Sequence, residues 1–280
     1  MSYGKTGPIS APTVRKDDLI GLVPTPSLSD MALQAARTIC PSPPRSHAPD
    51  QIIVCTTSFE HDLALSCAGR LHSELRSARP PFAIGQLQDV SFLTAVDIAL
   101  AMMHSDAALT TVLIVAAEGW HRCFSEQLAP RTALADGAAA TLIARSPISG
   151  WRVRALSICT AATQLAHNDV PISTSTVTLV EAINKSLSRA ALRAAQIDWI
   201  VPSTNDGEMV SAVCARCKLM PERIWGTDDT QRSHLCAAQT PARLGQLMRA
   251  ISPREGQRAL VWSTGYQGQA ACAILEYRSA

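Results

Sequence analysis

The chain has 280 residues, with 25 basic and 23 acidic side chains, a formal net charge of +2 and a mean hydropathy of +0.09. This near-balance leaves no basic field for nucleic acid, and the most apolar run, Thr111–Ala117, is too short to cross a bilayer. Nine cysteines do not make a disulfide scaffold in a chain of this length, and the first residues lack an apolar leader, so we expect a cytoplasmic protein with reduced thiols, no nucleic-acid partner and no membrane contact.

Helices and strands alternate along the first half of the chain. Apolar residues at spacings of three and four predict a helix over Ser29–Ile39, and a short apolar run predicts a strand over Gln51–Ser58. The proline-rich segment Cys40–Pro49 between them is expected to be a surface connector. The next helix is expected to contain Cys67 and Ala68, and a further helix is expected over Phe92–Met103, followed by a strand over Val112–Val115.

The second half repeats this order at a constant offset. A helix over Thr178–Ala195 leads into a strand over Asp198–Asn205, in which Val201 follows Val54 by 147 residues (201 − 54). The same offset relates Ala259–Trp262 to the strand that begins at residue 112 (259 − 112). An offset that holds over several elements indicates an internal duplication.

A strand that starts near a glycine closes each half, over Asp136–Ile143 and over Gln267–Ile274, with the offset reduced to 131 (268 − 137). We therefore expect two halves, 1–148 and 149–280, each with the order α-β-α-β-α-β-β. Alternating helices and strands predict an α/β protein with mostly parallel sheets covered on both faces. The two halves are expected to pack about a pseudo-twofold axis.

Four motifs, in this order and spacing, resemble those of the ketoacyl-ACP synthase III family of the thiolase superfamily. They are the segments Ala135–Ala140 (ADGAAA), Asp198–Pro202 (DWIVP), Leu219–Trp225 (LMPERIW) and the closing hairpin Leu260–Leu275. The resemblance extends over about residues 29–278. It implies a thiolase-like, five-layered αβαβα fold, a homodimer or a heterodimer, and acyl-CoA or acyl carrier protein as substrate without a further cofactor.

Members of this family use a cysteine nucleophile at a helix N-terminus, a histidine and an asparagine. Alignment of the motifs puts Asp89 at the cysteine position, Ser203 at the histidine position and His234 at the asparagine position. A carboxylate cannot carry an acyl group as a stable thioester, so two-step condensation by this chain alone is not expected. A negative side chain at a helix N-terminus is stabilised by about 0.3–1 kcal/mol, and we expect Asp89 to cap its helix.

Two hypotheses follow from these substitutions. In the first, the chain is a non-nucleophilic partner subunit that supports a cysteine-bearing thiolase-fold protein in a heteromeric synthase, as cysteine-less subunits of that family do. In the second, it is a one-step acyltransferase in which Asp89 orients His234, and His234 deprotonates an amine or alcohol that attacks a bound acyl thioester. A variant of the second makes Ser91 the nucleophile, with His234 as base.

Each candidate residue also has a structural interpretation. Ser91 takes the place of a small glycine and would serve close packing, and His234 would be a hydrogen-bonding loop residue. Ser203 or Thr204 would cap the following helix, with Asn205 or Asp206 as alternatives. Cys236 is either a relocated nucleophile or a small residue that lines its loop.

Two further groups of residues stand out. Glu118, Trp120 and His121 open a long connection, and we expect this connection to lie at the dimer interface and acyl pocket. Cys214 and Cys217 form a CxxC pair, but no second pair follows and the surrounding periodicity is helical. That pair is therefore expected to lie on a helix and not to bind a metal.

Overall fold

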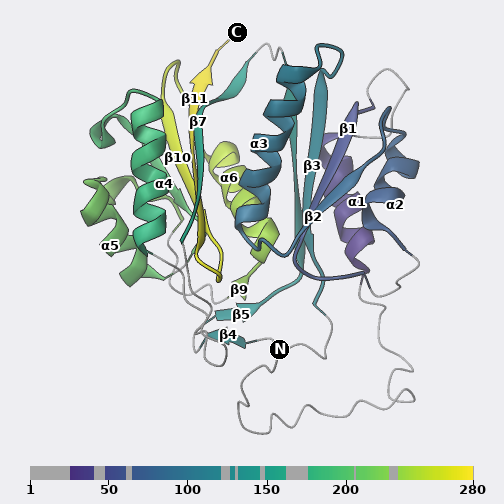
Figure 1. The fold of residues 1–280 in the computed structure, drawn as a ribbon, viewed down its shortest axis with the longest axis horizontal. Coiled ribbons are helices and arrows are strands. Elements are labelled where there is room, and N and C mark those ends of the chain that lie inside the picture. The colour runs from purple at the N-terminus through teal and green to yellow at the C-terminus, as the bar shows by residue number, and fades with distance from the viewer. Residues whose placement is uncertain are drawn as a thin grey trace, which may run out of the picture.

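The computed structural model describes residues 26–40, 48–60, 65–120, 127–129, 132–145, 149–161, 176–204, 206–226 and 233–279. Figure 1 shows two sheets with helices between them and on both outer sides. The predicted α/β class and the thiolase-like fold are confirmed, but the expectation of mostly parallel sheets is wrong: the two four-stranded sheets contain three parallel and three antiparallel strand pairs. Within the described residues, no helix combines the length and the apolar character needed to cross a membrane.

The first half follows the predicted alternation of helices and strands. Its elements are α1 (Leu28–Ile39), β1 (Gln51–Thr56), α2 (Cys67–Leu75), β2 (Phe82–Gly85), α3 (Val90–Ser105), β3 (Thr111–Glu118), β4 (Gln127–Ala129), β5 (Thr132–Leu134) and β6 (Gly137–Ala144). β1 pairs in parallel with β2 and β3, and β3 pairs antiparallel with β6, which gives the order β2-β1-β3-β6.

The second half repeats the central part of this pattern. Its main elements are β7 (Gly150–Thr160), α4 (Thr176–Arg189), β8 (Trp199–Pro202), α5 (Gly207–Cys217), β9 (Ser233–His234), α6 (Gln239–Ala250), β10 (Arg258–Thr264) and β11 (Gln269–Arg278). β8 is parallel to β10, β10 is antiparallel to β11, and β7 extends the sheet beyond β11. The strands β1, β3 and β6 therefore correspond to β8, β10 and β11.

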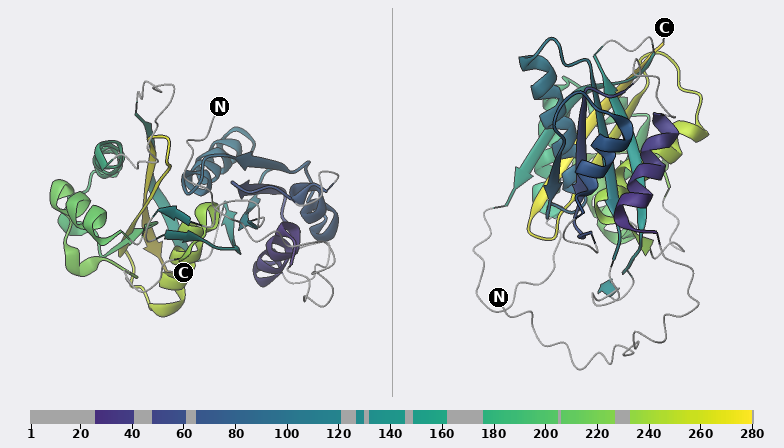
Figure 2. Two further views of the ribbon diagram at one scale, coloured as in Figure 1. Left: turned by 90° about the horizontal axis from the view of Figure 1, so that it is seen from below. Right: turned by 90° about the vertical axis from the view of Figure 1, so that its right-hand side faces the viewer.

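The two sheets and the helices on their faces form five layers (Figure 2, left). Three separate clusters of buried side chains lie between these layers. In β1, Ile52 and Val54 pack toward α1 and α2, whereas Ile53 and Cys55 pack toward α3 and α6. The second sheet packs one face against α3 and α6 and the opposite face against α4 and α5, where Trp262 is fully buried. Because both faces of each sheet are covered, the central strands β1, β3 and β10 are buried along almost their whole length, as the sequence predicts, whereas the edge strands β2 and β7 alternate between covered and exposed positions.

The second half departs from the predicted elements at three places. The helix expected to reach Ala195 ends at Arg189, because Ala191 adopts a left-handed conformation (φ 53°), and a separate 3-10 turn covers Ala194–Gln196. No strand equivalent to β2 forms among the described residues; a single bridge between Ile200 and Ile224 takes its place. The strand β7 was not predicted. Most of the expected connector, residues 41–47, lies outside the described residues.

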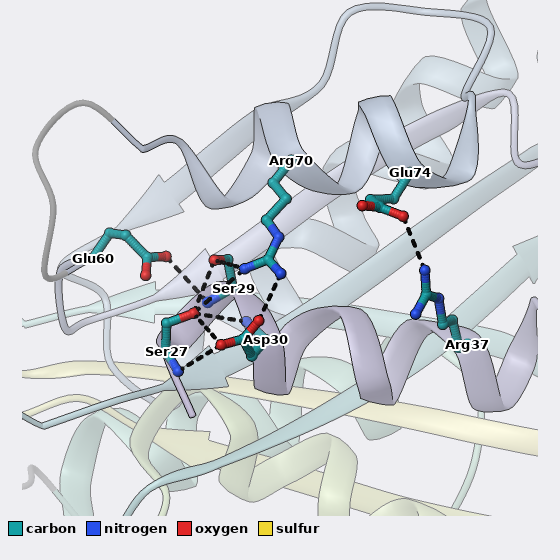
Figure 3. A network of polar contacts seen from close by, with 7 residues as sticks. All are labelled: Ser27, Ser29, Asp30, Arg37, Glu60, Arg70 and Glu74. Carbon is teal, nitrogen blue, oxygen red and sulfur yellow. Dashed lines mark hydrogen bonds and ion pairs between the residues drawn. The ribbon is translucent and has the colours of Figure 1, made fainter. Parts of the chain in front are cut away.

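A polar network joins the two outer helices of the first half (Figure 3). Ser27 caps α1 by accepting from the Asp30 amide, and Asp30 also forms an ion pair with Arg70 of α2 at 2.6 Å. A second pair, Arg37–Glu74 at 2.9 Å, links the same helices. These contacts are largely exposed, so each one contributes less than about 1 kcal/mol, and they mainly align α1 with α2.

Asp50, the residue before β1, links the start of β1 to the start of β3 through hydrogen bonds. Its Oδ2 accepts hydrogen bonds from the amide and hydroxyl of Thr110 (2.8 and 2.6 Å) and from the amide of Thr111 (2.9 Å). Partial burial acts to raise the pKa of Asp50, but these hydrogen bonds outweigh it and leave the pKa below its usual value. The stabilisation is therefore present above the unfolded pKa, about 3.9, and is lost as the pH falls through the lower folded pKa.

We predict that Asp50→Asn lowers the free energy of unfolding by about 1 kcal/mol at pH 7, and that the difference from the wild type narrows below about pH 4. Urea unfolding at several pH values measures this. Asp97→Asn, at an exposed position of α3, is the control and is expected to change little. A difference that does not depend on pH would contradict the role given to the Asp50 carboxylate.

Candidate functional site

The two central helices begin close together between the sheets (Figure 1). Asp89 is the N-cap residue of α3, and Cys236 opens the 3-10 turn Cys236–Ala238 that runs directly into α6. The two positions are separated by the repeat offset of 147 (236 − 89), so they are equivalent in the two halves. Since helix N-termini carry partial positive charge, this meeting point favours negatively charged groups.

Asp89 and His234 are in direct contact at this point. His234 Nε2 lies 2.9 Å from Asp89 Oδ1, and the two side chains are 9% and 3% exposed. At this distance the pair is an ion pair whenever the His234 imidazole is protonated. The contact is therefore an electrostatic one between two buried groups.

The short third sheet holds His234 in place. Strand β9 pairs in parallel with β5, and the amide of Ala135 donates to the His234 carbonyl at 3.0 Å. Next to it, Leu235 packs on Gly137, the first residue of β6, where a Cβ atom would lie 2.9 Å from Leu235 Cδ2. A side chain at the glycine of the ADGAAA motif would therefore displace the Leu235 side chain next to His234.

The charges around His234 set its protonation. Burial acts to lower its pKa, but the neighbouring charge of Asp89 outweighs this, and the net effect raises the pKa of His234 above its usual value. The positive charge of the buried Arg243 guanidinium also acts to lower the pKa of His234. Arg243 lies in α6 and donates to the carbonyls of Pro202 (2.8 Å) and Thr204 (3.2 Å). The interior of the site therefore holds an acid, an imidazole and a guanidinium.

Cys236 completes the group. Its sulfur, a carboxylate oxygen of Asp89 and a ring nitrogen of His234 all lie within 4.8 Å of one another, and all three residues are buried. Burial, followed by the charges of Asp89 and Glu118, raises the pKa of the Cys236 thiol. With negative groups beside it, this thiol is stable in its protonated form and is a poor nucleophile without further activation.

Glu118 ties the site together from the end of β3. It is fully buried and accepts hydrogen bonds from the amides of Thr57 (2.9 Å), Ser58 (2.8 Å) and Ala237 (3.0 Å). Burial raises its pKa, while these hydrogen bonds act to lower it. One carboxylate thus joins the ends of β1 and β3 to the turn that follows Cys236, and so it connects the two halves.

The structure separates the remaining predicted site residues from this contact. The Ser91 hydroxyl donates to the Gln88 carbonyl at 2.6 Å, so its proton is not directed at His234. The Ser203 hydroxyl is buried and has no partner among the described residues, and α5 is capped by Asp206, which accepts from the Met209 amide at 3.1 Å. The expected cap by Asp89 is also wrong: its side chain makes no capping hydrogen bond to α3.

Two further groups of residues were singled out in the sequence. In the connection that was expected at a dimer interface and acyl pocket, Glu118 is fully buried at the end of β3, and His121 lies outside the described residues. Cys214 and Cys217 are buried in the core around α5, where burial raises the pKa of each to about 11. The sequence analysis missed the role of Arg243, although its spacing with Thr240 and Leu247 marks the buried face of α6.

Comparisons with known proteins agree with this architecture. Residues 187–277 match the family model described as 3-oxoacyl-[acyl-carrier-protein (ACP)] synthase III C terminal. The 3-oxoacyl-(acyl carrier protein) synthase III, FabH, of Pseudomonas aeruginosa PAO1 is 16% identical with a TM-score of 0.73, and the match covers 90% of this chain and 84% of that one. ChlB3, described as an acyltransferase, is 18% identical with a TM-score of 0.75 and coverages of 91% and 85%.

OleA of Xanthomonas campestris is similar as well, at 18% identity, a TM-score of 0.69 and coverages of 89% and 81%. At these identities the structural matches establish the fold, and the family model adds the sequence pattern of the C-terminal third. Residues 187–277 therefore carry the sequence pattern of the C-terminal part of ketoacyl-ACP synthase III proteins, and the chain as a whole has the fold of those proteins. The resemblance inferred from its motifs is confirmed.

Glu118 offers a direct test of the site's construction. We predict that Glu118→Gln lowers the free energy of unfolding by about 2–3 kcal/mol, because one of the two acceptor oxygens becomes an NH2 group that faces backbone donors. Denaturant unfolding measures the change. Glu181→Gln, in an exposed pair with Lys185, is the matched control and should cost less than about 0.5 kcal/mol. Equal effects of the two substitutions would contradict the role of Glu118.

Proposed function

We propose that this chain is a non-nucleophilic subunit of a heteromeric synthase that acts on acyl thioesters. The observation that carries this proposal is the buried Asp89–His234 contact at the position where the family keeps its nucleophile. A carboxylate that attacked a thioester would form an anhydride, which water hydrolyses, so the covalent step of condensation is lost. This ion pair, with both side chains less than a tenth exposed, is suited to joining the two halves of the fold at that position.

One edge of the first sheet supports association with another protein. β2 is the terminal strand in the order β2-β1-β3-β6, and its residues alternate between half-buried and exposed positions. Phe82 and Ile84 pack against the core, while Ala83 is exposed. A terminal strand presents unpaired backbone groups along one side, and these can pair with a strand of a second subunit.

The ligand class follows from the relatives. The printed descriptions name carrier-protein synthases, an acyltransferase, and a variant of the 17% identical Xanthomonas campestris OleA solved with lauric acid and lauroyl-CoA. We extend this class to the present chain: acyl-CoA or acyl carrier protein reaches the partner's catalytic site, and this chain forms part of the assembly around it.

Co-expression tests the partner role. We expect the chain to co-purify at a 1:1 ratio with a cysteine-bearing thiolase-fold protein from the same genome, as measured by size-exclusion chromatography with light scattering. Ala83→Asp on the exposed side of β2 should weaken the complex by at least about 10-fold, since an unpaired charge would be buried. Val177→Asp, at an exposed position of α4, should leave it intact. A homodimer that no such protein displaces would contradict the proposal.

A one-step acyltransferase is the second candidate, favoured by the imidazole–carboxylate contact and the raised pKa of His234. In this mechanism His234 takes the proton of an amine or alcohol, the acceptor attacks the thioester carbonyl, and the thiol of the carrier leaves with that proton. Asp89 stabilises the imidazolium that forms.

For this candidate we predict that His234→Ala reduces turnover of acyl-CoA with an amine or alcohol by about 10²–10⁴-fold, whereas His104→Ala, at an exposed position, has no effect. Asp89→Asn should also reduce turnover, at constant KM for acyl-CoA. Absence of turnover by the purified wild-type chain would remove this candidate and leave the partner role.

A further inference from the structure

The site brings together three side chains of the kinds that bind transition metals. Asp89 supplies a carboxylate, His234 an imidazole and Cys236 a thiol, and their donor atoms all lie within 4.8 Å of one another. Each of the three residues is more than nine-tenths buried. The lining of the centre is thus a mixed oxygen, nitrogen and sulfur donor set.

The duplicated fold explains how these donors meet. Asp89 and Cys236 are equivalent residues of the two halves, each at the start of a central helix. His234 precedes Cys236 by two residues, so one turn provides both of the softer ligands. Cys236 adopts a left-handed conformation (φ 41°), which is unfavourable for a residue with a Cβ by about 1 kcal/mol or more. Strain of this kind is retained where the position of a side chain matters.

A second observation is the negative charge that surrounds the group. Asp89 Oδ1 is buried and lies 2.9 Å from His234 Nε2, so a cation placed between them would meet a carboxylate and an imidazole together. Glu118 adds a second negative charge nearby, with its oxygens already held by three amides. Two carboxylates beside a thiol repel a bare thiolate, but they attract a cation. The local charge therefore favours metal binding over a nucleophilic role for Cys236.

We propose that Asp89, His234 and Cys236 form a zinc site. Zn²⁺ takes carboxylate, imidazole and thiolate ligands at about 2.0–2.3 Å, which puts tetrahedral donors about 3.3–3.8 Å apart. The present spacing, 2.9 Å between Asp89 and His234 and no more than 4.8 Å across the group, brackets that range. Adjustments of about 1 Å in side-chain position are sufficient.

The charges of such a site balance. One carboxylate and one thiolate neutralise Zn²⁺, and three protein ligands leave a fourth position for water or for an oxygen of an acyl group. Arg243 is the opposing positive charge, but its guanidinium is directed at the carbonyls of Pro202 and Thr204.

This inference goes beyond the proposed function and is independent of any partner. It also separates the two candidate functions, because a histidine nitrogen that coordinates zinc cannot accept a proton. Resident zinc would leave the partner role in place and exclude His234 as a general base through that nitrogen.

Metal titration of the purified, tag-free chain after chelator treatment tests the site. We expect isothermal titration calorimetry to give one Zn²⁺ per chain, and Co²⁺ to produce a thiolate-to-cobalt absorption band. Asp89→Asn and Cys236→Ser should each weaken binding by about 100-fold or more. The matched control is the double variant Cys214→Ala/Cys217→Ala, which should bind as the wild type does. Loss of binding in this control with retention in Cys236→Ser would overturn the proposal.

X-ray absorption at the zinc edge tests the wild-type chain without relying on the folding of any variant. We expect one sulfur and two or three nitrogen or oxygen neighbours. No stoichiometric zinc binding, or a shell with two or more sulfurs, would overturn the assignment. Neither result would bear on the co-purification experiment, which reports on the partner role alone.

Discussion

The structure depends on one constraint: two equivalent helices, α3 and α6, begin at the same place between two sheets. The repeat offset fixes Asp89 and Cys236 at that place, one from each half. Two helix N-termini together favour negative groups, and the chain supplies a carboxylate and a thiol there. A relative with a thiol at the first position can form a covalent intermediate; a carboxylate at the same point retains the favourable charge but not that chemistry.

Buried charges then connect this point to the rest of the fold. Glu118 joins the strand ends of the first half to Ala237 in the second, and Arg243 joins α6 to the end of β8. Each of these groups is satisfied mainly by backbone partners, so removal of either one would leave several polar atoms unpaired. The meeting point of α3 and α6 is therefore held by a small number of ionic side chains as well as by packing, and this makes its geometry sensitive to single substitutions.

The sequence was sufficient to predict the architecture where periodic apolar residues set the element type. The strands β1, β3, β8 and β10 and the helices α1 and α3 fall where the apolar pattern and the offset of 147 put them. Local conformation was less accessible. Hydrophobic periodicity does not reveal the left-handed conformation of Ala191, which stops α4 from continuing. Nor does it reveal that an expected strand is reduced to the single bridge between Ile200 and Ile224.

The candidate site was predictable only in part, and for a similar reason. Motif alignment put Asp89 and His234 at equivalent positions to known catalytic residues, but it could not give the direction of a side chain. Ser91 turned out to be engaged by Gln88, and Glu118 and Arg243 proved to be interior residues. The contacts of Glu118 and Arg243 join segments more than thirty residues apart, such as Glu118 with Ala237. Contacts over such separations depend on how the chain packs, which the local sequence does not determine.

Intact-mass spectrometry of the purified chain after incubation with acyl-CoA tests the central claim most directly. If position 89 carries no nucleophile and Cys236 is not one, the mass should remain that of the unmodified chain, even with acyl-CoA in large excess. An acyl adduct of one group per chain, mapped by peptide analysis to Ser91 or Cys236, would contradict the account and restore an acyl-enzyme mechanism.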